Sequence, residues 1–240
     1  MRSQKKDGFS TFRHSEGIAD WNALPLDRRT KGGASLSGNE RDSLYLARGG
    51  KDFTNISGIS GLDDPGDGRS FAVLDFDRDG WPDLIVASAN YPTFQLYRNQ
   101  MGDKSSGGVR QNRMIAVRLV GGNAAGEASR EWSNRDAVGA VVMADLGGQE
   151  VVRERHAGEG LAAQNSPTML IGIGQHEAVA SLKVKWPSGK MQEIGKVAAG
   201  TLVTVYENPQ QSPDHKAATM KPYKVSSIHP PARRDLARLR

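Results

Sequence analysis

Short apolar stretches separated by turn residues run through the chain, and this pattern restricts its fold more than any other feature. The 240 residues include 28 Gly and 11 Pro, which interrupt long helices and favour turns. Several stretches alternate apolar and polar residues, as half-buried strands do. No stretch approaches the roughly 18 apolar residues of a membrane-spanning helix, so we expect no transmembrane segment. The pattern predicts an all-β protein.

Residues 43–99 contain about four short strands joined by tight turns, which is the content of one propeller blade. The strand candidates are residues 43–46, 70–74, 83–88 and 94–98, and the stretch 53–56 follows the first of them. We therefore expect one propeller-blade-like antiparallel sheet here. A closed propeller needs at least about four blades, and residues 1–111 have room for two at most, so we expect no closed propeller within this chain.

Residues 112–208 form a second β-rich domain. Gly147 and Gly148 separate two apolar stretches and indicate a hairpin, and residues 187–190 provide a second turn. The strand candidates are residues 114–120, 140–144, 149–154, 182–186, 191–194 and 201–206.

The remaining segments lack a sustained period. Residues 1–42 are predicted to be loop-rich, and residues 100–111 are predicted to form a linker. Residues 209–240 hold seven Lys and Arg against two Asp and Glu, together with five Pro. This composition predicts a disordered basic tail. The basic start at Met1 lacks the apolar core of a signal peptide, so no export signal is visible.

An Asp-rich segment between two strand candidates carries the strongest chemical signal. Its four carboxylates stand at loop positions 1, 3, 5 and 9, as Asp75, Asp77, Asp79 and Asp83. Alternate residues of a tight loop point inward, and a Gly at position 6 permits the sharp turn that returns the last Asp to the same point. Hard oxygen ligands in a flexible loop suit Ca²⁺, and the backbone carbonyl of Trp81 can complete the shell. We therefore expect a Ca²⁺ site, with a solvated acidic turn as the alternative.

The segment is not an EF-hand, because position 12 is Val86 instead of Glu and strands flank the loop. Residues 75–84 instead resemble the calcium loop of FG-GAP/VCBS repeats, the blades of integrin-like β-propellers. The second domain resembles the ASPIC/UnbV domain, which commonly follows these repeats in cartilage-acidic-protein-like sequences. The residues that match this domain are 134–140, 158–164, 171–174 and 184–190. Ala137 and Ile173 depart from the usual Gly and Leu, and Ala137 would resist a positive φ.

The resemblance implies a non-catalytic, calcium-binding interaction or adhesion module that acts outside the cytoplasm, secreted or at the cell surface. Its partner would be a protein or a glycan. The composition adds exclusions: the absence of Cys excludes a disulfide scaffold and thiol catalysis, and 6% aromatic residues argue against a stacking surface for nucleic acid. We therefore expect no specific nucleic-acid partner.

Two other functions remain open at this stage. The first is an enzyme in which Ca²⁺ is structural and His156 or Asp136 acts in the active site. The sequence, however, shows no catalytic nucleophile paired with a general base. The second is a binder of anionic polymers that uses the basic ends of the chain. For Asn134, Arg135 and Asp136 we favour a structural turn network, and for Trp186 packing against a hairpin.

Overall fold

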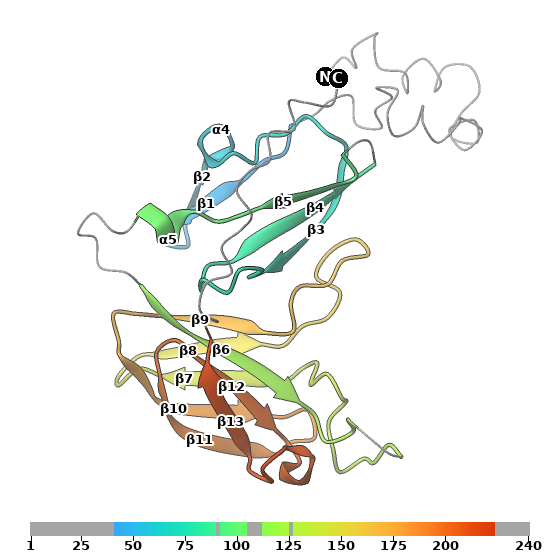
Figure 1. Cartoon of the computed structure of the whole chain (residues 1–240), viewed down its shortest axis with the longest axis vertical. Coiled ribbons are helices and arrows are strands. Elements are labelled where there is room, and N and C mark those ends of the chain that lie inside the picture. The colour runs from blue at the N-terminus through green and yellow to red at the C-terminus, as the bar shows by residue number, and fades with distance from the viewer. Residues whose placement is uncertain (1–40, 90–91, 105–111, 125–126, 224–240) are drawn as a thin grey trace. The chain divides into compact units, whose positions relative to one another are not determined.

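The computed structural model describes residues 41–89, 92–104, 112–124 and 127–223, and these residues form a nearly all-β structure (Figure 1). The all-β prediction is confirmed. The predicted loop-rich segment 1–42 lies outside the described residues except for its last two. Within the described part of the chain, no helix is long and apolar enough to cross a bilayer.

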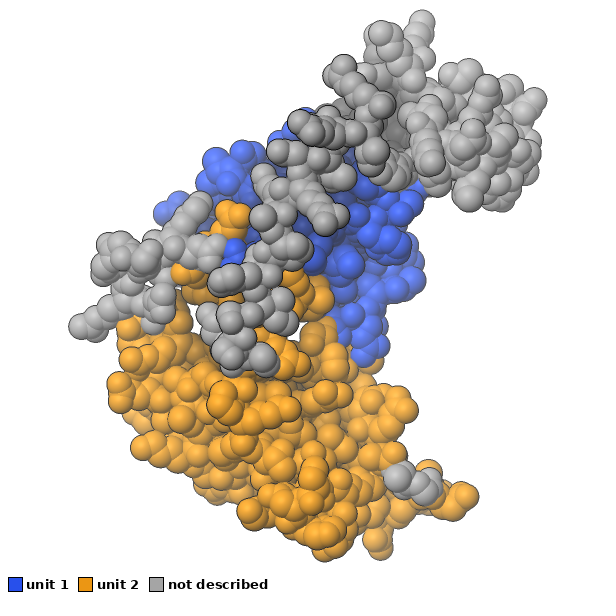
Figure 2. Space-filling view, in the orientation of Figure 1, with its two compact units in different colours: residues 1–73, 83–98, 158–165 blue, residues 74–82, 99–157, 166–240 orange. Residues whose placement is uncertain are grey.

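Contacts divide the chain into two compact units, and each unit is made of several separate stretches of the sequence (Figure 2). The first unit contains residues 1–73, 83–98 and 158–165. The second contains residues 74–82, 99–157 and 166–240. The loop that carries three of the four predicted Asp ligands therefore groups with the second β-rich domain, although its flanking strands belong to the first unit.

The first region, residues 41–104, forms two small sheets in place of the single sheet expected. Strands β1 and β2 pair antiparallel, and a separate sheet has the order β3-β4-β5. The short helix α4 and the turn after it separate β2 from β3. The elements are β1 (Tyr45–Arg48), β2 (Asp52–Asn55), α4 (Ser57–Ser60), β3 (Gly68–Leu74), β4 (Asp83–Ser88), β5 (Phe94–Tyr97) and α5 (Met101–Lys104).

Helix α5 lies inside the predicted linker, so the first residues of that segment are helical, while residues 105–111 lie outside the described residues. No closed propeller is present among the described residues, which agrees with the small number of strands.

The second region, residues 112–223, forms two four-stranded sheets with the orders β11-β10-β7-β8 and β13-β12-β6-β9. The pairings in these two sheets are antiparallel except β12 with β6, which is parallel. The strands are β6 (Arg113–Val120), β7 (Val141–Asp145), β8 (Glu150–Glu154), β9 (Met169–Gly174), β10 (Ala178–Lys185), β11 (Met191–Ala198), β12 (Thr201–Tyr206) and β13 (Ala218–Pro222). The predicted second β-rich domain is confirmed.

One buried apolar cluster joins the two sheets of the second region. Alternate residues of β6 point into it, and β10 contributes Val179, Leu182 and Val184. Trp186 is only 2% exposed in the same cluster. The period of two along each strand explains this arrangement, because every second side chain of both sheets faces the space between them.

The prediction of a disordered tail is wrong for residues 209–223. Residues Pro209–Gln211 form the 3₁₀ turn η1, and β13 pairs antiparallel with β12 along its full length. Tyr223, directly after β13, is 6% exposed. The edge of β12 presents unpaired backbone groups, and this segment satisfies them despite its weak strand propensity. Residues 224–240 lie outside the described residues.

Candidate metal site

The Asp-rich segment forms the turn between β3 and β4. Strand β3 ends at Leu74 and β4 begins at Asp83, so the predicted ligands occupy one connecting loop. Gly80 has a φ of 93°, a left-handed conformation that a side chain resists. The expectation that Gly80 allows the sharp turn is confirmed. Arg78 also has a positive φ, of 55°, which is uncommon for a residue other than Gly.

Asp75 organises the backbone of this loop. Its Oδ1 accepts a hydrogen bond from the Asp79 amide at 3.1 Å, and its Oδ2 accepts one from the Gly80 amide at 2.9 Å. The Oδ1 of Asp77 also lies 3.3 Å from the Asp79 amide. These bonds hold the first carboxylates of the loop on its inner side.

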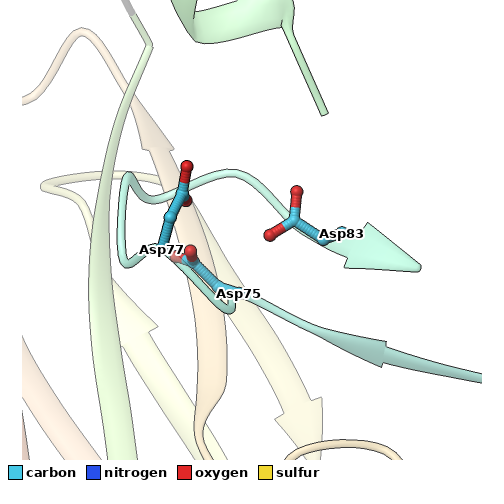
Figure 3. A group of neighbouring side chains, drawn as sticks. All are labelled: Asp75, Asp77 and Asp83. Atoms are coloured by element: carbon cyan, nitrogen blue, oxygen red, sulfur yellow. The ribbon is translucent and has the colours of Figure 1, made fainter. Parts of the chain in front are cut away.

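Three of the four predicted carboxylates converge. Asp75, Asp77 and Asp83 each offer an oxygen atom, and these atoms all lie within 4.8 Å of one another (Figure 3). Two oxygens bound to one Ca²⁺ at about 2.3–2.6 Å can be separated by at most about 5 Å. The donor set and its spacing therefore fit a hard cation such as Ca²⁺.

The other two predicted ligands have different local roles. The Oδ1 of Asp79 accepts a hydrogen bond from the Trp81 amide at 2.8 Å, and Asp79 is outside the group of three. A Cβ placed on Gly102 would lie 2.7 Å from Nε1 of Trp81, so the indole lies against α5. Ligation by Asp79 and by the Trp81 carbonyl stays a prediction.

Burial makes the carboxylate of Asp75 harder to ionise than an exposed one. Burial is the largest influence and raises its pKa, and the nearby Asp79 acts in the same direction. Hydrogen bonds from Gly80, Tyr223 and Asp79 oppose this rise without reversing it. Because like charges crowd here, a divalent cation would remove a repulsion that the loop otherwise has to tolerate.

A second polar centre, which the sequence analysis missed, surrounds Glu207 after β12. This carboxylate is 4% exposed and accepts hydrogen bonds from the Gly122 amide at 2.8 Å and the Ser133 amide at 2.7 Å. The hydroxyls of Ser133 and Ser188 donate to it at 2.9 and 2.5 Å. Burial acts to raise the pKa of Glu207, but these donors outweigh it and lower the pKa. No local sequence signal distinguishes Glu207 from an exposed Glu at a strand end.

Of the polar residues 134–136, Asn134 forms turn hydrogen bonds of the kind that the sequence favours. The side chain of Asn134 accepts from the Val138 amide and donates to the Val138 carbonyl, both at 2.9 Å. Arg135 and Asp136 pair with each other at 3.0 Å on the exposed surface. Ala137 adopts a φ of 53°, the strained conformation that favours Gly at this position.

Two further residues singled out from the sequence are placed by the fold. Trp186 packs in the core, and its Nε1 donates to Gln192 at 2.7 Å, which confirms a packing role for it. The side chain of His156 is about half exposed, and its Nδ1 lies 3.9 Å from Oε1 of Glu154.

Comparison with known protein families matches residues 34–86 to the FG-GAP-like repeat, residues 68–109 to the FG-GAP repeat, and residues 130–212 to ASPIC and UnbV. The chain carries FG-GAP repeats followed by an ASPIC/UnbV domain. The resemblance drawn from the Asp loop and the later motifs is therefore confirmed. No curated protein matches the chain.

The first region is thus the FG-GAP region, and the second is the ASPIC/UnbV region. The Asp loop lies where the two FG-GAP matches overlap, at residues 68–86. FG-GAP repeats are generally associated with calcium binding and are typical of extracellular proteins. Strands β6 and β13 lie outside the ASPIC/UnbV match, yet both belong to its sandwich.

Proposed function

We propose that this protein is a non-catalytic, calcium-binding extracellular module that binds a protein or glycan partner. The convergence of Asp75, Asp77 and Asp83 within 4.8 Å carries the calcium part of the proposal. The FG-GAP and ASPIC/UnbV architecture supports the extracellular interaction part. The ion would neutralise the crowded carboxylates and hold the turn between β3 and β4.

Exposed apolar side chains in and around the FG-GAP region support a binding role. Among the residues that the structure describes, nine of the thirteen large exposed hydrophobic residues fall between residues 45 and 101. They are Tyr45, Leu46, Phe53, Ile59, Phe71, Phe76, Phe94, Leu96 and Met101. A concentration of exposed apolar side chains in one part of a chain favours an interaction role for that part.

Thermal unfolding with EGTA and with millimolar Ca²⁺ tests the calcium proposal. A ligand present at a hundredfold excess over its dissociation constant should stabilise the native chain by about 2.7 kcal/mol. We expect a higher melting temperature in Ca²⁺ for the parent chain and no shift for Asp77→Asn. Asn keeps an oxygen that can accept the hydrogen bond from Asp79 but removes the charge.

Asp52→Asn is the matched control, because Asp52 lies on the exposed strand β2 outside the loop. This variant should respond to Ca²⁺ as the parent does. If the parent shows no shift in Ca²⁺, the loop is an acidic turn and the calcium proposal is wrong.

The alternative use of the basic ends for anionic polymers needs a truncation that respects the fold. Because β13 completes a sheet, the chain should be cut after Tyr223 instead of before residue 209. Under our proposal, partner binding depends on Ca²⁺ and survives this cut. Steep loss of binding with salt, or with the cut, would favour the polymer binder instead.

A further inference from the structure

The C-terminal strand β13 ends beside a small apolar cluster on the ASPIC/UnbV sandwich. Tyr223 follows the strand, and its amide donates to the Gly200 carbonyl at 2.8 Å. Its side chain packs with Ala116 and Leu202, and Met114 packs against the same cluster. Tyr223 is therefore held by both its backbone and its ring.

The Asp loop lies on this same cluster. A Cβ added to Gly80 would lie 3.2 Å from Cγ of Met114, so the loop backbone is in close contact with that side chain. Residues 74–82 also group with residues 166–240 in one compact unit. The hydroxyl of Tyr223 forms a hydrogen bond with the carboxylate of Asp75.

This contact makes the tyrosine hydroxyl a donor to the carboxylate. A tyrosine hydroxyl carries its proton at neutral pH, and an ionised carboxylate can only accept a hydrogen bond. A carboxylate offers about four lone-pair sites. The Asp79 amide, the Gly80 amide and the Tyr223 hydroxyl occupy three of them, which leaves one for a cation.

We infer that Tyr223 is a positioning residue for the calcium site: its hydroxyl orients Asp75 toward the ion and couples ion binding to the docking of β13. This inference rests on the proposed calcium function. Removing a group that hydrogen-bonds to a metal ligand typically lowers the metal affinity by about 10–100-fold. The coupling is reciprocal, because a contact that favours ion binding must itself be favoured by the bound ion.

Calcium titration by calorimetry of the chelator-treated full chain tests the inference. Tyr223→Phe removes only the hydroxyl and leaves the ring in its cluster, and we expect the dissociation constant for Ca²⁺ to rise about tenfold or more. Tyr206→Phe removes a hydroxyl from the neighbouring strand β12 and should leave the affinity unchanged. Parent-like affinity in Tyr223→Phe overturns the inference while leaving the calcium function intact. Absence of binding by the parent chain overturns both.

Terbium luminescence separates positioning from general stability. Trp81 lies in the loop and can sensitise bound Tb³⁺, and decay rates in H₂O and D₂O report the water molecules on the ion. If Asp75 loses its orientation in Tyr223→Phe, water should replace its oxygen and the hydration of the ion should increase. A variant that is less stable in EGTA but has unchanged affinity and hydration would show a structural role only, against the inference.

Hydrogen exchange tests the reciprocal effect. Ca²⁺ should slow exchange of the β13 amides in the parent chain and in Tyr206→Phe. This protection should be lost in Tyr223→Phe and in Asp77→Asn. Equal protection of β13 in Tyr223→Phe and in the parent would contradict the coupling.

Discussion

The FG-GAP and ASPIC/UnbV regions use the same short strands and tight turns, but only one of them builds an apolar core. In the ASPIC/UnbV region two sheets face each other, and the residues between them are almost completely buried. Among the described residues of the FG-GAP region, no apolar side chain reaches that burial, and Phe94 is 69% exposed. The difference arises because a sheet buries its apolar face only against another layer.

Polar residues take the buried positions of the FG-GAP region. Ser57, Asp67 and Asp83 are each less than a tenth exposed. The Ser57 hydroxyl accepts from the Leu44 amide at 2.8 Å and donates to Asn55 at 2.6 Å. Repeats of this kind rely on neighbouring repeats to bury their faces, so hydrogen-bonded turns and, in our proposal, an ion hold this one.

The largest contrast should come from removing one large side chain in each region. Trp186→Ala empties a site in the packed core and should destabilise the chain by about 3–5 kcal/mol. Phe94→Ala removes an exposed ring and should change stability by no more than about 0.5 kcal/mol. Urea unfolding followed by circular dichroism measures both. A similar loss for the two variants would mean that the FG-GAP region has an apolar core after all.

The next effect tests whether the ASPIC/UnbV region also depends on a buried polar centre. Glu207→Gln replaces one carboxylate oxygen with an NH₂ group, which is a donor and faces the N–H and O–H donors around it. We expect this variant to lower the free energy of unfolding by about 2–3 kcal/mol. The control is Glu177→Gln, since the side chain of Glu177 is 89% exposed. Urea unfolding should detect no change for this control. Equal stability of the two variants would argue that water already satisfies the donors around Glu207.

Within the FG-GAP region, we expect a polar substitution to lower stability more than the removal of a large apolar side chain does. Ser57→Ala leaves the Leu44 amide without its side-chain acceptor, and should cost about 1–2 kcal/mol. The polar substitution should therefore exceed the effect of Phe94→Ala in the same region. Hydrogen exchange of the Leu44 amide is the most direct measurement. Unchanged protection of that amide would rule out the proposed role of Ser57.

The smallest effect is a dependence on pH. The pKa of Glu207 is lower in the folded chain than its ordinary value, so its ionised form contributes stability above about pH 4.3. This contribution is lost as the pH falls through the lower folded value. The stability difference between the parent and Glu207→Gln should therefore shrink on going from neutral pH into this acid range. A difference that stays constant throughout that range would refute the assigned shift.

Local patterns predicted most strands because the alternation of apolar and polar side chains can be recognised from consecutive residues. Strand β12 matches the predicted range 201–206, and β4 matches 83–88. The Asp loop was predictable for the same reason, since its carboxylates and Gly80 stand at fixed spacings within one turn. Strand β9 was missed because Gly172 and Gly174 weaken its strand signal, although both Gly residues pair with β6.

The sequence by itself determined most of the strands, the Asp loop and the order of the two regions, because each depends on neighbours along the chain. Only the tertiary structure decided that residues 218–222 become β13, that Glu207 is a buried acceptor, and that Tyr223 contacts Asp75. These features join residues separated by many positions. Their energies depend on which backbone edge, donor or carboxylate the folded chain places opposite them, and a local pattern carries no record of that placement.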